Sequence, residues 1–225
     1  MKKRRSLHEI FLSNGGPVVN KWLHYFDIYE KHFARFVGTA PTILEIGVFK
    51  GGSLYMWQEY FGEGTRIVGL DINPDCKQYA GENIEVVIGS QDDPAVLDDL
   101  LSRYQFDIVL DDGSHVMEHL NASFRLIYDR ISPDGVYMLE DLHTCYLPRW
   151  GGGLKREGSF METVKDRIDD LHATYCKDLP VSDFTRSTAS INIYDSIVAF
   201  EKRPQGARLH VKSGAMGLLP SDFAR

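Results

Sequence analysis

The sequence lacks the long apolar run of about 20 residues that a membrane helix needs. It also lacks an excess of positive charge, because 25 Lys and Arg stand against 32 Asp and Glu, a formal net charge of −7. Such a chain is not expected to bind the phosphate backbone of nucleic acid. The one basic run, Lys2 to Arg5, is not followed by a signal peptide. We therefore expect neither a nucleic-acid partner nor a membrane partner.

Cysteine is scarce as well. The three cysteines, Cys76, Cys145 and Cys176, are odd in number and lack the spacing of zinc ligands. This pattern favours a reducing, cytoplasmic location. No Pro/Gly/Ser-rich linker divides the middle of the chain, and we find no internal repeat. The 225 residues, 43% of them hydrophobic, suit one domain with a sizeable core.

Strand patterns and helical patterns alternate through most of the chain. Strand-like runs lie at Thr42–Val48, Arg66–Asp71, Ile84–Ile88, Phe106–Asp111 and Gly135–Glu140. Helical patterns lie at Asn20–Val37, Ser53–Tyr60, Pro94–Tyr104 and Val116–Ile131. The alternation predicts a parallel sheet with helices on both faces.

The last strand-like runs differ, because Ser187–Ile193 and Ser196–Lys202 flank only Tyr194 and Asp195. So short a connection favours an antiparallel hairpin. The predicted fold is therefore α/β: a Rossmann-like, seven-stranded, mostly parallel sheet that ends in an antiparallel hairpin, the outline of a class I methyltransferase. We expect one domain over residues 1–225, with a helical extension at 1–40, a catalytic core at 42–203 and a tail at 204–225. The Gly- and Arg-rich stretch 147–158 is a candidate lid.

A glycine-containing loop follows the first strand and indicates a nucleoside site. It reads EIGVFKGGS from Glu45 to Ser53, and glycines let the backbone approach a ligand closely. The dinucleotide fingerprint would need glycine at Phe49, which argues against NAD. S-adenosylmethionine has an adenosine but no pyrophosphate, so it fits better. The candidate cofactor contacts of this loop are Glu45, Gly47, Gly51 and Ser53.

Further candidate contacts end the next strands. Asp71 ends the second strand, where a carboxylate can accept both ribose hydroxyls; alternatively it caps a turn. Ser90 and Gln91 follow the third strand and suit an adenine edge, and Asp111 ends the fourth.

Three carboxylates are expected to meet at one rim of the sheet. Asp112 follows the fourth strand and Glu140 and Asp141 end the fifth, and these strands are neighbours in the usual methyltransferase order. Carboxylates in contact repel unless a cation neutralises them, and oxygen ligands suit Mg²⁺ or Mn²⁺. As alternatives, the aspartates cap the next helix or the acids form a solvated strand end.

Two histidines are candidates for the general base beside these acids. His115 lies close enough in sequence to take a proton from an acceptor hydroxyl. His143 is the rival base or a partner of the first. His115 to His119 also spells H-x-x-E-H, which leaves a zinc hydrolase with Glu118 as base as an alternative. The position of His115 in a turn before the helix disfavours it.

These motifs together resemble one enzyme family. The segments EIGVFKGGS, DDGSH, EDLHTCY and IYDSIVAFEK, in order between about residues 42 and 203, are similar to the metal-dependent O-methyltransferases of macrolide sugars, of the mycinamicin and macrocin type. Cephalosporin-hydroxylase-type proteins share the frame. The resemblance implies Mg²⁺ held by Asp112, Glu140 and Asp141, with His115 as the base.

The expected function is therefore S-adenosylmethionine- and Mg²⁺-dependent O-methylation of a sugar hydroxyl on a glycoside or oligosaccharide. A catechol or another small diol is the alternative acceptor, since the same metal chemistry serves both. Trp22 and Phe33 on the first predicted helix either form a homodimer face or belong to the core.

Overall fold

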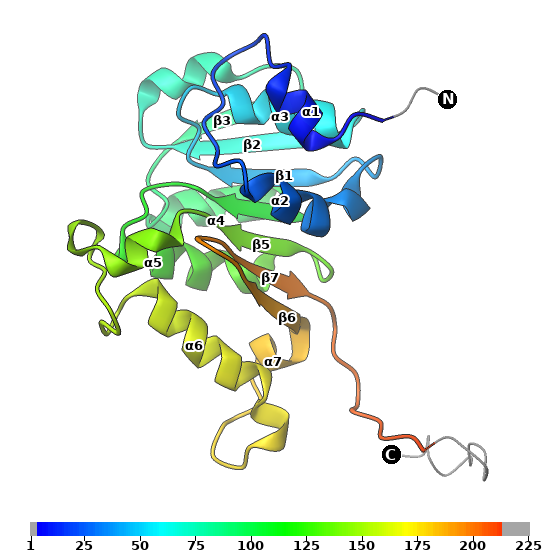
Figure 1. Ribbon diagram of the computed structural model, residues 1–225, viewed down its shortest axis with the longest axis vertical. Helices are drawn as coiled ribbons and strands as arrows, with labels where there is room; N and C mark the ends of the chain where they lie inside the picture. Colours follow the sequence, from blue (N-terminus) through cyan, green and yellow to red (C-terminus); the bar gives the residue numbers. More distant parts are fainter. Residues whose placement is uncertain (1–3, 213–225) are drawn as a thin grey trace.

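The computed structural model describes residues 4–212 and contains one seven-stranded sheet in the order β3-β2-β1-β4-β5-β7-β6 (Figure 1). The strands are β1 (Thr42–Ile46), β2 (Arg66–Asp71), β3 (Ile84–Ile88), β4 (Ile108–Asp111), β5 (Val136–Leu139), β6 (Thr188–Ile193) and β7 (Val198–Lys202). Strands β1 to β5 pair in parallel, and β7 pairs antiparallel with both β5 and β6. The predicted fold class and terminal hairpin are confirmed.

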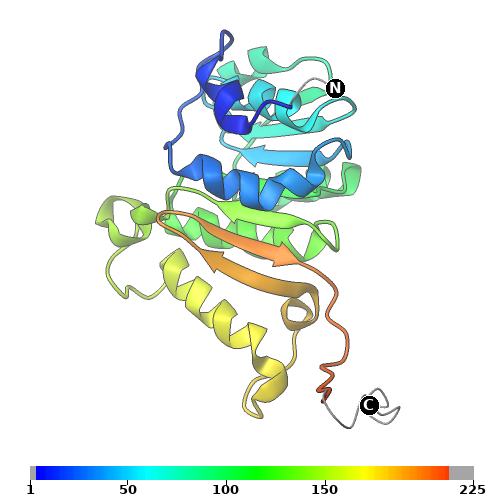
Figure 2. The same cartoon turned by 45° about the vertical axis from the view of Figure 1, so that its right-hand side comes forward.

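Helices cover both faces of the sheet, as Figures 1 and 2 show. The helices α1 (Leu7–Leu12), α2 (Tyr25–Phe33) and α3 (Gly52–Phe61) share one hydrophobic cluster with the strands. On the other face lie α4 (Pro94–Arg103), α5 (Met117–Ile127), α6 (Phe160–Leu171) and α7 (Asp183–Ser187). The first cluster lies between the sheet and α1 to α3, and the second between the sheet and α4 to α7. Side chains alternate along each strand, so Ile43 packs into the first cluster and its neighbour Leu44 into the second.

The amino-terminal region differs from the prediction. The predicted helix Asn20–Val37 begins only at Tyr25, and residues 18–22 before it form no regular structure. The short helix α1, absent from the prediction, begins with a capping box between Ser6 and Glu9. Of the two aromatics considered for a dimer face, Phe33 is buried in the core, whereas Trp22 is 56% exposed.

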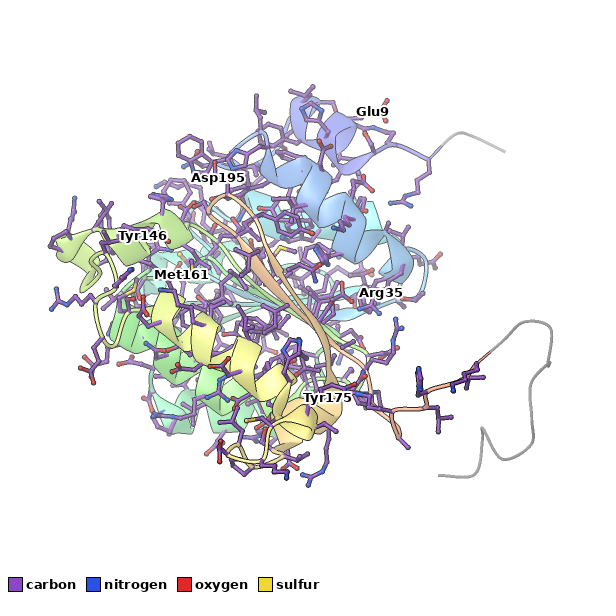
Figure 3. All side chains as sticks on the ribbon, turned by 60° about the horizontal axis from the view of Figure 1, so that its bottom comes forward. Glu9, Arg35, Tyr146, Met161, Tyr175 and Asp195 are labelled. Atoms are coloured by element: carbon purple, nitrogen blue, oxygen red, sulfur yellow. The ribbon has the colours of Figure 1, made fainter. Side chains whose placement is uncertain are left out.

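Short 3₁₀ segments supplement the regular helices. They are η1 (Ala34–Phe36), η2 (Pro74–Tyr79), η3 (Tyr128–Arg130), η4 (Leu142–Tyr146), η5 (Pro148–Trp150) and η6 (Ala173–Tyr175). The candidate lid at 147–158 contains η5, and Trp150 packs there against the second cluster. Figure 3 shows the hairpin tip, marked by Asp195, on the same side of the molecule as Tyr146.

Residues 1–3 and 213–225, which include part of the predicted basic run and most of the predicted tail, lie outside the described residues. Between residues 4 and 212, no helix has the length and apolar character that a membrane crossing requires.

Candidate active site

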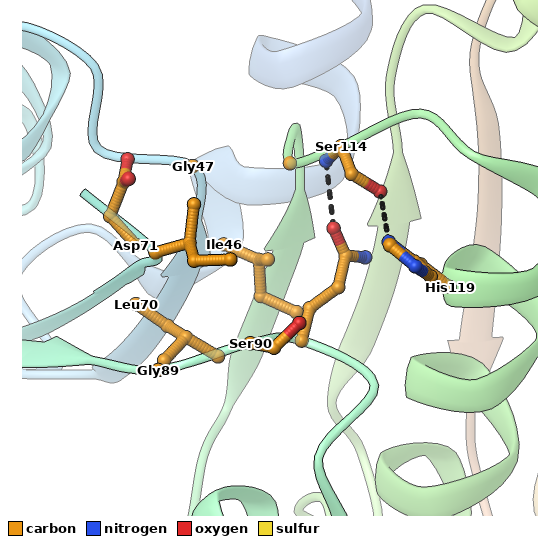
Figure 4. Close-up of a pocket in the computed structure, with 11 residues that line it drawn as sticks. Ile46, Gly47, Leu70, Asp71, Gly89, Ser90, Ser114 and His119 are labelled. Atoms are coloured by element: carbon orange, nitrogen blue, oxygen red, sulfur yellow. Dashed lines mark hydrogen bonds between the residues drawn. The ribbon is translucent and has the colours of Figure 1, made fainter. Parts of the chain in front are cut away.

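A pocket of about 170 Å³ lies beyond the carboxyl ends of β1, β2 and β3 (Figure 4). Ile46 and Leu70 give it apolar walls, while Ser90, Ser114 and His119 line its polar side. We call it the first pocket. An apolar space with a polar edge has the character of a small-molecule site.

Two further pockets continue along the same edge of the sheet. The second pocket, of about 440 Å³, shares Gly47, Asp71 and Gly113 with the first. The third pocket, of about 500 Å³, shares Asn20, Asp112 and Asp141 with the second. The three pockets are therefore adjacent, and the second lies between the other two.

Glycine is required at two positions of the loop after β1. Gly47 has φ +94°, and a Cβ there would lie 2.1 Å from the carbonyl oxygen of Asp112. Gly51 has φ +72°, and its Cβ would lie 2.3 Å from the ring of Tyr79. The loop can follow this path only because both residues lack a side chain. Phe49 between them is 58% exposed and lines the second pocket.

Asp71 anchors this loop through its carboxylate. One oxygen, Oδ2, accepts hydrogen bonds from the backbone N–H groups of Val48 (2.8 Å) and Phe49 (3.1 Å). The other, Oδ1, accepts from the N–H of Asn73 (2.8 Å). Asp71 also lines both the first and the second pocket, so it shapes the loop and faces the space that a ligand would fill.

Glu45 and Ser53 lie beneath the pockets rather than in their walls. The Ser53 hydroxyl donates to Glu45 Oε2 at 3.0 Å, and the Glu45 side chain is completely buried. Burial raises the pKa of Glu45 to about 7, although the nearby charge of Lys21 acts in the opposite direction. Among the described residues, Glu45 Oε1 has no hydrogen-bond partner.

Asp111 is completely buried and reaches the first pocket only through Gln91. Its carboxylate accepts from Gln91 Nε2 (3.0 Å), Ser123 Oγ (2.7 Å) and Tyr137 Oη (3.1 Å), and burial raises its pKa. The other end of the amide, Gln91 Oε1, accepts from the Ser114 N–H at 2.7 Å, a bond drawn in Figure 4. Asp111 thus fixes Gln91, and Gln91 fixes the turn that lines the pocket.

Asp112, His115 and Asp141 come together where the second and third pockets meet. His115 Nε2 lies 3.8 Å from both Asp112 Oδ1 and Asp141 Oδ2. One ligand atom from each residue lies within 4.8 Å of the others. His115 has φ +56° and Asp141 φ +53°. Left-handed backbone at non-glycine residues costs energy and is concentrated at functional sites.

The amino-terminal segment reaches the acids, which the sequence did not reveal. Lys21 Nζ donates to Asp112 Oδ2 (2.6 Å) and to Glu140 Oε2 (2.9 Å). Burial alone would lower the pKa of Lys21, but the charges of the surrounding acids outweigh it and raise the pKa. Burial raises the pKa of Glu140 to about 8, and the charge of Lys21 opposes this shift.

Two tyrosines of α2 bind the two acids after β5, Glu140 and Asp141. The Tyr25 hydroxyl donates to Asp141 Oδ1 (2.6 Å), and the Tyr29 hydroxyl donates to Glu140 Oε1 (2.5 Å). Their spacing of four residues places both hydroxyls on one side of the helix. That spacing was the one signal in the sequence that could have marked them as polar contacts rather than core aromatics.

His143, the rival base, and His119, of the zinc alternative, are not members of this cluster. His143 is exposed in the wall of the third pocket, with its Nδ1 2.7 Å from Ser196 Oγ. His119 lies on α5, with its Nδ1 3.0 Å from Ser114 Oγ, and lines the first pocket. His115 and His119 therefore do not share one helix face, and Glu118 is exposed. The described residues do not form the H-x-x-E-H zinc site considered as an alternative.

The strand order and the position of these pockets define a class I methyltransferase fold. Residues 44–142 match a family model described as a methyltransferase domain. The chain is 36% identical over 221 residues to demethylmacrocin O-methyltransferase of Streptomyces fradiae, covering 90% of this chain and 54% of that protein. It is 35% identical over 201 residues to mycinamicin VI 2''-O-methyltransferase of Micromonospora griseorubida, covering 80% and 49%.

A solved structure shows the same similarity. MycE methyltransferase from the mycinamycin biosynthetic pathway, in complex with Mg and SAH, is similar with a TM-score of 0.79 and 29% identity, covering 90% of this chain and 55% of that one. The predicted resemblance to macrolide-sugar O-methyltransferases is thereby confirmed. The chain spans about half the length of the curated relatives it matches.

Proposed function

We propose that this chain carries an O-methyltransferase site that uses S-adenosylmethionine, a divalent cation and a sugar hydroxyl. One observation carries the proposal. The second pocket lies between the first and the third, and the cluster of Asp112, His115 and Asp141 lines it, with both aspartates shared with the third pocket. A donor in the first two pockets would therefore present its methyl group to an acceptor in the third. Residues 42–203 would form the catalytic core.

The donor fits the first two pockets. The apolar walls and polar side of the first pocket suit adenine, and Asp71 lies where the first pocket passes into the second, the place of a ribose. Lys50 lines the second pocket and offers an ammonium to the amino-acid carboxylate of the donor. The similar MycE structure is a complex with SAH, the product of this donor.

The acids fit a hard divalent cation, as their oxygen donors do in general. Asp112 Oδ1 and Asp141 Oδ2 both face His115, outside the hydrogen bonds that their other oxygens accept. Glu140 would join them only if the ammonium of Lys21 left its Oε2. When bound, Mg²⁺ or Mn²⁺ would supply a Lewis acid that makes a neighbouring acceptor hydroxyl more acidic.

His115 would act as the general base. It lines the second pocket, so it lies next to the donor, and its Nε2 faces Asp112 and Asp141. These carboxylates would stabilise the imidazolium that forms when His115 takes the proton of the acceptor. His143 lines the third pocket instead and would contact the acceptor at a distance from the methyl group.

The acceptor would be a glycoside. The relatives are named for methylation of demethylmacrocin and of mycinamicin VI, and one MycE structure is a complex with mycinamycin VI. Trp22, Tyr25 and His143 line the third pocket, and rings beside polar groups suit a sugar, which has apolar faces and hydroxyl edges. A catechol stays the alternative acceptor. The cytoplasmic location and the homodimer stay predictions.

The test combines binding with turnover. S-adenosylhomocysteine is titrated into chelator-treated protein by calorimetry, and labelled methyl transfer is then measured with Mg²⁺ on a panel of deoxyhexosyl macrolides and on a catechol. We expect binding of S-adenosylhomocysteine and transfer to a glycoside. Transfer to the catechol alone would show that the acceptor is a catechol and not a glycoside. Absence of S-adenosylhomocysteine binding would overturn the proposal.

Matched variants show whether transfer depends on the proposed site. Asp112→Asn should abolish transfer, because it removes a charge from the junction of the pockets. Asp166→Asn removes the same charge from an exposed position on α6 and should not affect transfer. Equal activity of the two variants would show that methyl transfer does not depend on this site.

A further inference from the structure

The ammonium of Lys21 occupies the position between two of the acids expected to bind the metal. It lies 2.6 Å from Asp112 Oδ2, 2.9 Å from Glu140 Oε2 and 3.9 Å from Glu45 Oε1. Its side chain is only 4% exposed. A lysine this deeply buried is retained only where it is paired, and here one ammonium faces the carboxyl groups of three acids.

Lys21 is carried by a segment with few other attachments. Residues 15–23 connect α1 to α2 without regular structure, and we call them the strap. Val18, Trp22 and Leu23 are 60%, 56% and 64% exposed. The strap crosses the start of α3 closely, since a Cβ at Gly52 would lie 2.3 Å from the carbonyl oxygen of Pro17. Lys21 is therefore the main charged anchor of a largely exposed connection.

The strap also forms one side of the third pocket. Asn20, Lys21, Trp22 and Leu23 all line it, opposite Asp141 and the other acids. A displacement of Lys21 would therefore change the pocket proposed for the acceptor. The contacts of Lys21 couple two properties of the site: how the acids are neutralised, and how the acceptor pocket is bounded.

We propose that Lys21 is a tethered cation that competes with the divalent metal for Asp112 and Glu140, so that metal loading displaces it and releases the strap. The proposal rests on the metal site of the proposed function. In the metal-free chain the strap holds the ammonium next to the acids, so the metal must displace a preformed ion pair. An ammonium in place about nine-tenths of the time or more weakens the apparent metal affinity by about tenfold or more.

The competition is tested by Mg²⁺ titration of the chelator-treated full chain and of Lys21→Met. Methionine keeps an unbranched side chain of similar length without the charge. We expect Lys21→Met to bind Mg²⁺ at least tenfold more tightly. Lys165→Met is the control, because Lys165 also pairs with a carboxylate, Glu162 Oε1 at 2.5 Å, but on the exposed surface of α6 away from the pockets. The Mg²⁺ affinity of the control variant should rise less than threefold.

The displacement is tested without any substitution. Hydrogen exchange of the backbone amides of residues 15–23 is measured in the unaltered chain with and without saturating Mg²⁺. We expect exchange in the strap to accelerate when Mg²⁺ binds. This readout keeps the inference testable if Lys21→Met fails to fold.

Different outcomes separate this inference from the proposed function. Equal or weaker Mg²⁺ binding by Lys21→Met, equal gains in both variants, or unchanged strap exchange in the Mg²⁺-loaded chain would overturn the competition alone. If neither the unaltered chain nor Lys21→Met binds Mg²⁺ while S-adenosylhomocysteine still binds, the metal site and the competition both fail.

Discussion

Replacement of Gly47 by alanine tests whether the close approach of β1 and β4 shapes the donor site. The added Cβ would lie 2.1 Å from the Asp112 carbonyl oxygen, where real Cβ contacts do not fall below 3.0 Å. The two loops must therefore separate by almost 1 Å. Overpacking of this kind costs about 1–3 kcal/mol, and the left-handed backbone adds about 1–2 kcal/mol for a residue with a Cβ.

Gly62→Ala is the matched control. Gly62 has φ +93° against +94° for Gly47, but a Cβ there meets nothing within 4 Å. It lies just after α3, at the opposite end of this helix from Gly51. With its ψ of −165°, Gly62 lies in a backbone region essentially confined to glycine, so Gly62→Ala carries strain of about 1–3 kcal/mol without the collision.

Thermal unfolding and calorimetry separate the two effects. For a chain of this size each kcal/mol lowers Tm by about 2–4 °C. Gly47→Ala should lower Tm by about 4–20 °C and weaken S-adenosylhomocysteine binding at least tenfold. Gly62→Ala should lower Tm by about 2–12 °C and leave this binding within twofold. Equal losses of Tm in the two variants, with donor binding intact in Gly47→Ala, would refute the reasoning.

Three further outcomes follow from the site. Asp71→Ala should weaken S-adenosylhomocysteine binding at least tenfold in calorimetry, because three backbone N–H groups lose their acceptor; unchanged affinity would argue against its anchoring role. His115→Gln should lower kcat by about 10²–10⁴-fold without changing donor affinity, and a comparable loss only in His143→Gln would reverse the choice of base. Burial raises the pKa of Glu140 from 4.5 to about 8, so between these values the folded, metal-free chain keeps a proton that the unfolded chain has lost. Its free energy of unfolding should fall as pH rises through this window. Urea unfolding at several pH values should show a smaller fall for Glu140→Gln than for the unaltered chain. An equal fall in both proteins would contradict the raised pKa of Glu140.

The positions of the sheet strands could be predicted because each forms a short apolar run bounded by turn residues. The meeting of the acids past the strand ends could also be predicted, because neighbouring parallel strands end at one edge of the sheet. The start of α2 was placed too early, because the apolar spacing of Trp22 and Leu23 continues the helical pattern although both side chains are exposed. Periodicity alone does not distinguish an exposed apolar loop from a helix turn.

The roles of Glu45, Asp111 and Lys21 could not be predicted. Glu45 and Asp111 lie within strands, so their side chains point onto the faces of the sheet beneath helices rather than beyond its edge. Lys21 meets its acids across 91 and 119 residues of sequence, and no local pattern encodes such a contact. The acids could be recognised from the sequence, but the cation that neutralises them could not.

The strap has a consequence for protein engineering. The groups proposed for chemistry belong to the sheet edge and its loops, whereas Asn20, Trp22 and Leu23 belong to a short connection before α2. A graft of residues 15–23 from a relative with another substrate would replace one side of the acceptor pocket in a single exchange. The graft would leave β1, β4 and β5 and the residues they position unchanged, which makes this segment a compact target for altering the range of glycosides accepted.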